Sequence, residues 1–133
     1  MAYILACLMA SLSFMINRRL VRSIGPNVVI GLGPLLEEAA KTLPAYLLNA
    51  DILLVHVLFG LLEALYDCQQ SERHKIGAAL ASLGGHSLFG LVSVGFLSLT
   101  GVVWVGLAGG YIVHLVWNVF AVNFFSVRKG RRH

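Results

Sequence analysis

Long apolar stretches constrain the fold of this chain more than any other feature of its sequence. Five of them follow one another, at about residues 2–16, 28–48, 52–66 (extending to about 70), 76–99 and 102–127. A helix that spans a bilayer needs about 20 apolar residues. With 58% hydrophobic and 12% charged residues in a length of 133, the chain has more apolar surface than a water-soluble core of this size can bury. The sequence therefore predicts an all-α, polytopic membrane bundle of about five transmembrane helices, built as one domain over residues 1–133.

The same composition excludes several other classes of protein. Disordered chains and nucleic-acid modules need polar sequences, and secreted folds held by disulfides need more than the two cysteines present here. The first apolar stretch is followed, not preceded, by its positive charges. It is therefore predicted to be a retained helix and not a cleaved signal peptide.

The basic residues mark one side of the predicted bundle. Nine of the ten lysines and arginines fall in alternate connections or in the C-terminal segment: Arg18, Arg19, Arg22, Arg73, Lys75, Arg128, Lys129, Arg131 and Arg132. The positive-inside rule assigns this side to the cytoplasm, so the N-terminus is predicted outside and the C-terminus inside. The basic tail, residues 126–133, is expected to contact anionic headgroups of the lipid bilayer, and no nucleic-acid partner is expected.

Small residues and prolines indicate where helices break and where they pack. Gly31, Gly33 and Pro34 predict a broken or re-entrant start of the second stretch. Small residues that recur every fourth position allow helices to approach closely in lipid. These are Gly77, Ala81 and Gly85, and then Gly106 and Gly110.

Ionisable residues lie inside the apolar stretches, where each costs roughly 2.5–3.5 kcal/mol on insertion scales. The charged ones are Glu37, Glu38, Lys41 and Glu63, and His86, His114 and Asn118 add further polar groups. Counted inward from the basic ends at about 1.5 Å per residue, these positions fall at a similar depth, near the midplane. The sequence therefore predicts one buried polar site assembled from four helices, in which Lys41 neutralises one of the two glutamates.

The residue types leave three interpretations of this site open. In the first, Glu63, His86 and His114 bind a catalytic zinc ion, a glutamate of the 37–38 pair deprotonates its water, and Asn118 hydrogen-bonds the oxyanion. In the second, a glutamate and His114 activate water without a metal. In the third, the same groups form a salt-bridge network that fixes helix register, as in a scaffold or an ion pathway.

The ordered motifs resemble those of a known superfamily. They run Glu37-Glu38-Ala-Ala-Lys41, Phe59-Gly-Leu-Leu-Glu63, Gly85-His86-Ser-Leu-Phe-Gly90 and His114-Leu-Val-Trp-Asn118. This set resembles the PrsW-type intramembrane peptidases, within the superfamily of CAAX prenyl proteases and bacteriocin-processing enzymes. The resemblance implies proteolysis in the membrane, with Glu37, Glu38, His114 and Asn118 as catalytic residues and Glu37 as the preferred base.

The resemblance also implies supporting residues and partners. Lys41, Phe59 and Trp117 support the site, within a candidate catalytic core of residues 28–125. The implied substrate is a membrane protein or peptide, such as an anti-sigma factor or a prenylated or processed peptide. The implied location is a prokaryotic plasma membrane, and a homo-oligomer is left open. We therefore expect a zinc-assisted intramembrane endopeptidase, with a non-enzymatic scaffold and a proton or cation pathway as the alternatives.

Overall fold

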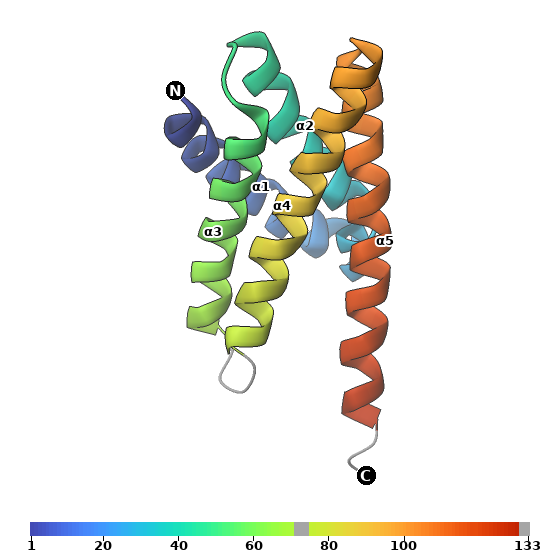
Figure 1. Ribbon diagram of the computed structural model, residues 1–133. Coiled ribbons are helices and arrows are strands. Elements are labelled where there is room, and N and C mark those ends of the chain that lie inside the picture. Colours follow the sequence, from blue (N-terminus) through green and yellow to red (C-terminus); the bar gives the residue numbers. More distant parts are fainter. Residues whose placement is uncertain (71–74, 131–133) are drawn as a thin grey trace.

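The structure is all-helical over the residues it describes. The computed structural model describes residues 1–70 and 75–130, with side chains up to residue 121 apart from those at 26, 29, 70 and 75. The elements are α1 (Ala2–Ile24), η1 (Pro26–Val29), α2 (Leu32–Leu47), α3 (Ile52–Gln70), α4 (Lys75–Thr100) and α5 (Val103–Gly130) (Figure 1). The predicted all-α fold is confirmed. Residues 71–74 of the predicted polar loop and residues 131–133 of the predicted tail lie outside the described residues.

Within the described residues, four of the five long helices can cross a membrane by length and composition. They cover Ala2–Ile24, Ile52–Gln69, Ile76–Thr100 and Val103–Ala121. α2 differs because its 16 residues extend only about 24 Å at 1.5 Å per residue, which is less than a hydrocarbon core of about 30 Å. The chain therefore has the architecture of a multi-pass membrane protein, with α2 as a shorter helix held among the others.

α1 extends further than the sequence predicted. The segment after Ile16 was expected to be a connection, but the helix continues through all three arginines to Ile24. Arginine is a good helix former, so nothing in this segment interrupts the hydrogen bonding. The helix stops at Gly25, whose φ of 108° favours glycine, and at Pro26, which lacks a backbone N–H.

The predicted break before the second stretch is present. The chain forms the short 3-10 helix η1, turns at Ile30–Gly31, and begins α2 at Leu32. Pro34 falls in the first turn of α2, where its missing N–H costs no intrahelical hydrogen bond. The glycines and prolines thus set the start of the helix that carries Glu37 and Glu38.

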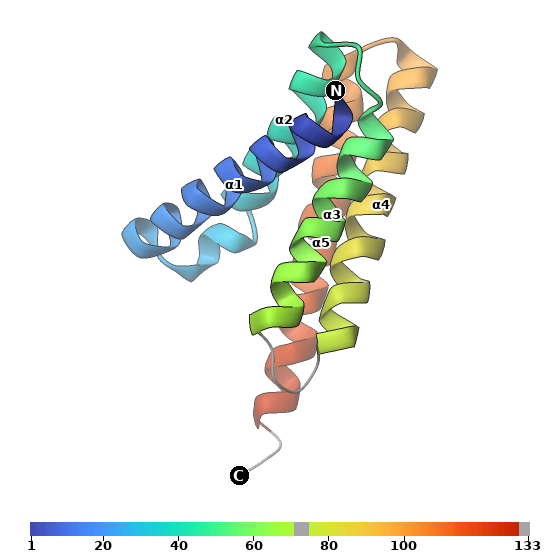
Figure 2. The ribbon, with the colours of Figure 1, turned by 90° about the vertical axis from the view of Figure 1, so that its left-hand side faces the viewer.

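Three of the long helices are roughly parallel, and α1 is inclined to them. α3, α4 and α5 run side by side, whereas α1 slants away from them toward its C-terminal end (Figure 2). At the N-terminal end of α1, apolar side chains of α1, α2 and α3 form a buried cluster. Its members are Ala2, Leu5, Ala6, Ala45, Ile52 and Val55.

Two glycines bring α3 and α4 together. A Cβ atom on Gly60 would lie 2.8 Å from the Cβ of His86, and one on Gly90 would lie 2.7 Å from the Cβ of His56. Both distances are shorter than side chains tolerate, so glycine is required at both positions for this close approach. Of the small residues that the sequence singled out, Gly106 does pack closely, since its Cβ would meet the Ser93 carbonyl at 2.6 Å. Gly77 faces open space.

Candidate functional site

A fully buried carboxylate lies at the centre of the polar cluster. Glu38 is on α2 and has no exposed surface. Lys41 Nζ lies 2.5 Å and His114 Nδ1 lies 2.9 Å from its Oε1, and His56 Nε2 lies 3.0 Å from its Oε2. Because α3 and α5 each contribute one partner, this carboxylate ties three helices together. A buried charge is tolerated when it is paired and hydrogen-bonded in this way.

Lys41 is the buried cation that balances this charge. Its ammonium also lies 2.9 Å from His86 Nδ1 and 4.7 Å from the centre of the Phe59 ring. An ammonium has only donors, so His86 Nδ1 accepts and the proton of this imidazole is on Nε2. That nitrogen faces Glu63 Oε2, to which it donates a hydrogen bond. The sequence left open which glutamate Lys41 neutralises, and the structure assigns it to Glu38.

His56 faces an oxygen atom with each of its ring nitrogens. Nδ1 lies 2.9 Å from the backbone carbonyl of Ile52, and Nε2 faces the Glu38 carboxylate. A carbonyl oxygen only accepts, so Nδ1 carries a proton, and the contact between Nε2 and Oε2 needs a second one. His56 and Glu38 therefore share a proton that ties α3 to α2.

A cleft of about 1050 Å³ opens beside this buried cluster. The residues that line it come from all five long helices. They include Asn17, Arg18 and Arg22 of α1, Glu37 of α2, Phe59, Glu63 and Asp67 of α3, Ser82, His86 and Phe89 of α4, and His114, Trp117 and Asn118 of α5. The cleft therefore reaches the edge of the buried cluster, where His86 and His114 belong to both.

Glu37 occupies a different environment from its neighbour Glu38. It lines the cleft, Asn17 Nδ2 donates to its Oε1 at 2.5 Å, and its Oε2 lies 3.9 Å from His114 Nε2. The last distance is too long for a direct hydrogen bond, and it is short enough for both groups to contact the same water molecule in the cleft. Since His114 Nδ1 is engaged by Glu38, the second ring nitrogen of His114 is directed to Glu37.

The structure brings the predicted site residues into one region with two distinct parts. Glu38 and Lys41 lie in the buried cluster, and Glu37, Glu63 and Asn118 line the cleft. Of the supporting residues, Phe59 lies beneath the Lys41 ammonium. Trp117 lines the cleft and approaches Phe89 edge-on, with ring centres 6.2 Å apart. The two glutamates that the sequence treated as a pair therefore have separate surroundings.

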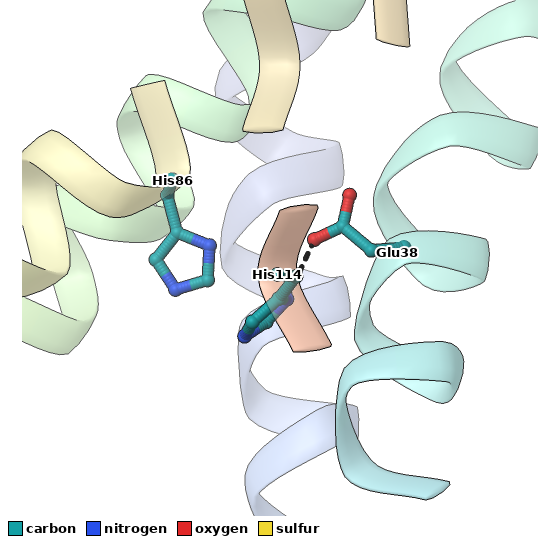
Figure 3. A group of neighbouring side chains, drawn as sticks. All are labelled: Glu38, His86 and His114. Carbon is teal, nitrogen blue, oxygen red and sulfur yellow. Dashed lines mark hydrogen bonds and ion pairs between the residues drawn. The ribbon is translucent and has the colours of Figure 1, made fainter. Parts of the chain in front are cut away.

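A metal-ligand set can be built from this region, but it differs from the predicted one. Among the described residues, Glu38, His86 and His114 form such a set (Figure 3). Each offers one ligand atom, and these atoms lie no more than 4.8 Å from one another. Glu38 takes the place that the sequence gave to Glu63, whose carboxylate instead accepts from His86 Nε2. These three residues can hold a metal ion.

The Lys41 ammonium competes with a metal ion for that position. It contacts both Glu38 Oε1 and His86 Nδ1, and a divalent cation beside an ammonium is repelled. Catalytic zinc needs three protein ligands and an open position for water. The group therefore fits a metal only when the Lys41 side chain moves away, so in the arrangement described here the lysine is the cation of the site.

Two contributors to the site were not among its predicted residues. The sequence places His56 on the same helical stripe as Glu63, seven residues later, but this stripe alone assigned it no role. Asn17 was missed because the first helix was predicted to end at Ile16, which left Asn17 in a connection. Its Oδ1 is buried and has no hydrogen-bond partner among the described residues. Gly33 leaves room for this amide, since a Cβ there would lie 3.3 Å from the same oxygen.

Comparisons with known proteins give no further assignment. No protein-family model, curated protein or solved structure matches this chain.

Proposed function

We propose that the chain is an intramembrane endopeptidase in which Glu37 activates water directly. The observation that carries the proposal is that Glu37 and His114 face the same cleft, with 3.9 Å between Glu37 Oε2 and His114 Nε2. Glu38 has no exposed surface and contacts three cationic or hydrogen-bonding partners, so it is closed to substrate and water. Glu37 is the carboxylate of the pair that substrate and water can reach.

The reaction needs only groups that line the cleft. A water molecule between Glu37 and His114 gives a proton to the Glu37 carboxylate and attacks the carbonyl carbon of the substrate. The C–N bond then breaks, and the leaving amine takes the proton from Glu37. Asn118, one turn beyond His114 on α5, supplies an amide N–H to the developing oxyanion. The buried Lys41–Glu38 pair holds His114 by its other nitrogen and keeps it oriented.

The proposed substrate is a membrane protein or peptide segment. A helical peptide bond is hydrogen-bonded and covered by side chains, so the segment must unwind before hydrolysis. The cleft volume of about 1050 Å³ is at the upper end for ligand pockets, which span about 300–1,000 Å³. This volume suits a short extended segment and is too small for a whole helix.

Zinc enters this proposal only as the alternative to direct activation. A zinc-dependent version places the ion among Glu38, His86 and His114 and requires the Lys41 ammonium to leave. We favour the metal-independent version because Lys41 already supplies the positive charge there.

The test compares newly formed N-termini in membranes. Host cells express the wild type, Glu37→Gln or the control Asp51→Asn, and peptide N-termini of the membrane fraction are quantified by mass spectrometry. Asp51 caps α3 by accepting from Leu54 N–H, and Asn caps equally well, so this control removes one carboxylate at a distance from the cleft. We expect N-termini that depend on the wild type and fall at least about 100-fold in Glu37→Gln, as for loss of a general base. Cleavage that persists in Glu37→Gln refutes the mechanism, whereas identical N-termini with and without the wild type favour the scaffold.

A proton pathway is the second candidate, favoured by the continuous chain of polar contacts. The contacts run from Glu63 through His86, Lys41 and Glu38 to His114. Ionisable groups inside membrane helices are typical of proton relays. At the N-terminal end of α1, however, the helices are joined by the apolar cluster defined above. We therefore expect no proton flux through the wild type in proteoliposomes, and measurable flux would favour the pathway.

A further inference from the structure

The cleft has a cationic wall that the proposed peptidase chemistry does not use. Because α1 continues as a helix through residue 24, Arg18 and Arg22 lie one turn apart, and both line the cleft. Arg19, between them in sequence, does not line it. The helix therefore divides its three arginines into two that face the cleft and one that faces elsewhere.

Within the described part of the chain, neither of these two guanidinium groups forms an ion pair, although Glu37, Glu63 and Asp67 also line the cleft. Among the described residues, no carboxylate lies within 4 Å of either one. Like charges one turn apart on a helix repel each other. An anion placed between them removes this repulsion, and phosphate matches the planar fork of arginine in two parallel hydrogen bonds.

The cleft also has apolar lining residues on three helices. Phe14 and Val21 of α1, Ala78 and Ala81 of α4, and Ala121 of α5 all line the same cleft. A ligand that fits both parts has an anionic group at one end and a hydrocarbon chain at the other. We propose that this cleft binds a phospholipid with an anionic headgroup, with its phosphate between Arg18 and Arg22 and an acyl chain along these apolar residues.

An acidic polypeptide would also complement the two arginines, but it is a less suitable occupant at the membrane surface. The cytoplasmic flanks of membrane-spanning segments are rich in lysine and arginine, and Arg18 and Arg22 repel such flanks. The cytoplasmic leaflet, by contrast, is rich in anionic lipids, and each basic residue near its surface is attracted to them. With the predicted orientation the arginines lie on that side, so a lipid is the favoured occupant. This inference concerns occupancy of the cleft and holds whether or not the chain hydrolyses peptides.

Trp117 gives a direct readout because it lines the cleft. The other tryptophan, Trp104, is 63% exposed and is replaced in a Trp104→Phe background. The protein is reconstituted into phosphatidylcholine vesicles that contain a fixed minor fraction of either brominated phosphatidylglycerol or brominated phosphatidylcholine. Bromine quenches tryptophan fluorescence on contact, so we expect stronger quenching by the brominated phosphatidylglycerol.

Arginine variants test whether the preference for phosphatidylglycerol depends on Arg18 and Arg22. Arg18→Gln and Arg22→Gln are each expected to weaken it about fivefold, whereas Arg19→Gln, which removes the same charge from the same helix, changes it less than about twofold. Far-UV circular dichroism and gel filtration confirm that each variant is folded. The comparison of the two brominated lipids in the Trp104→Phe background needs no arginine variant, so it tests the lipid preference even if an arginine variant does not fold.

Three results would overturn the proposal. The first is equal quenching by the two brominated lipids. The second is an effect of Arg19→Gln as large as that of Arg18→Gln, which would indicate general attraction to the membrane surface. The third is displacement of brominated phosphatidylglycerol by a membrane-spanning peptide with an Asp/Glu flank but not by unbrominated phosphatidylglycerol, which would assign the arginines to a polypeptide.

Discussion

Glu37 and Glu38 are adjacent in sequence and opposite in surroundings. Successive residues of a helix point about 100° apart, so one carboxylate lies in the buried cluster and the other lines the cleft. Glu38 holds Lys41, His56 and His114 together, and Glu37 contacts Asn17. The two residues therefore have separable roles, one in stability and one in the proposed chemistry.

Replacement of Glu38 is expected to destabilise the fold, and replacement of Glu37 is not. Glu38→Gln leaves the Lys41 ammonium buried without its counter-charge, which costs about 3–5 kcal/mol when one partner of a buried pair is removed. Glu37→Gln keeps an amide that can still contact Asn17. Thermal unfolding in detergent, followed by circular dichroism, measures both. Equal melting temperatures for the two variants would contradict the assignment of Glu38 as the structural carboxylate.

The lysine also determines the metal content that we expect. Lys41→Met removes the ammonium from between Glu38 and His86 and frees both for a metal ion. Wild-type protein purified without chelator should contain well under one zinc ion per chain. The Lys41→Met variant, purified in the same way, should contain more zinc. Elemental mass spectrometry measures the content, with Lys41→Met/His114→Ala as the control that lacks a ligand. About one zinc per wild-type chain, lost in His86→Ala/His114→Ala, would restore the zinc mechanism.

At the scale of the elements, close contact between α3 and α4 determines where the histidines lie. His56 and His86 are each packed against a glycine of the other helix, Gly90 and Gly60. The two side chains can occupy the interface because the glycines opposite them have no Cβ. The same glycines therefore determine both the packing of the pair and the position of the site.

Glycine substitutions within α4 separate packing from helix propensity. Gly90→Ala places a Cβ 2.7 Å from the Cβ of His56, whereas Gly84→Ala meets nothing within 4 Å. We expect Gly90→Ala to destabilise the fold by about 1–3 kcal/mol through overpacking. Gly84→Ala should be neutral or stabilising, by up to about 1 kcal/mol, because alanine is the better helix former. Unfolding in sodium dodecyl sulfate measures the difference, and similar stability of the two variants would argue against the close packing.

At the scale of the whole molecule, the structure is polarised from one end to the other. The buried apolar cluster joins the helices at the N-terminal end of α1. The cleft, with Arg18 and Arg22 in its wall, is lined by the C-terminal half of α1. Arg18 and Arg22 are among the basic residues from which the cytoplasmic side was predicted, so that prediction places the cleft near the cytoplasmic leaflet.

The orientation itself remains a prediction that reporter fusions can test. The positive-inside rule predicts a cytoplasmic C-terminus, so a C-terminal green fluorescent protein should fluoresce and a C-terminal alkaline phosphatase should be inactive in a bacterial host. As a control, Arg18, Arg19 and Arg22 are replaced together by Gln, which should weaken this bias. Active phosphatase at the wild-type C-terminus would reverse the orientation and with it the leaflet that the cleft faces.

The sequence by itself determined the class of fold and the set of polar residues that converge. Apolar stretches of membrane length have few alternatives to the helix, and ionisable groups at a common depth must meet inside the bundle because lipid cannot solvate them. Only the tertiary structure decided which groups pair. It assigned Lys41 to Glu38, separated Glu37 into the cleft, and brought Asn17 and His56 to the site. Helical spacing fixes the face on which a side chain lies, but the partner on that face depends on how the neighbouring helices tilt and how closely their glycines let them approach.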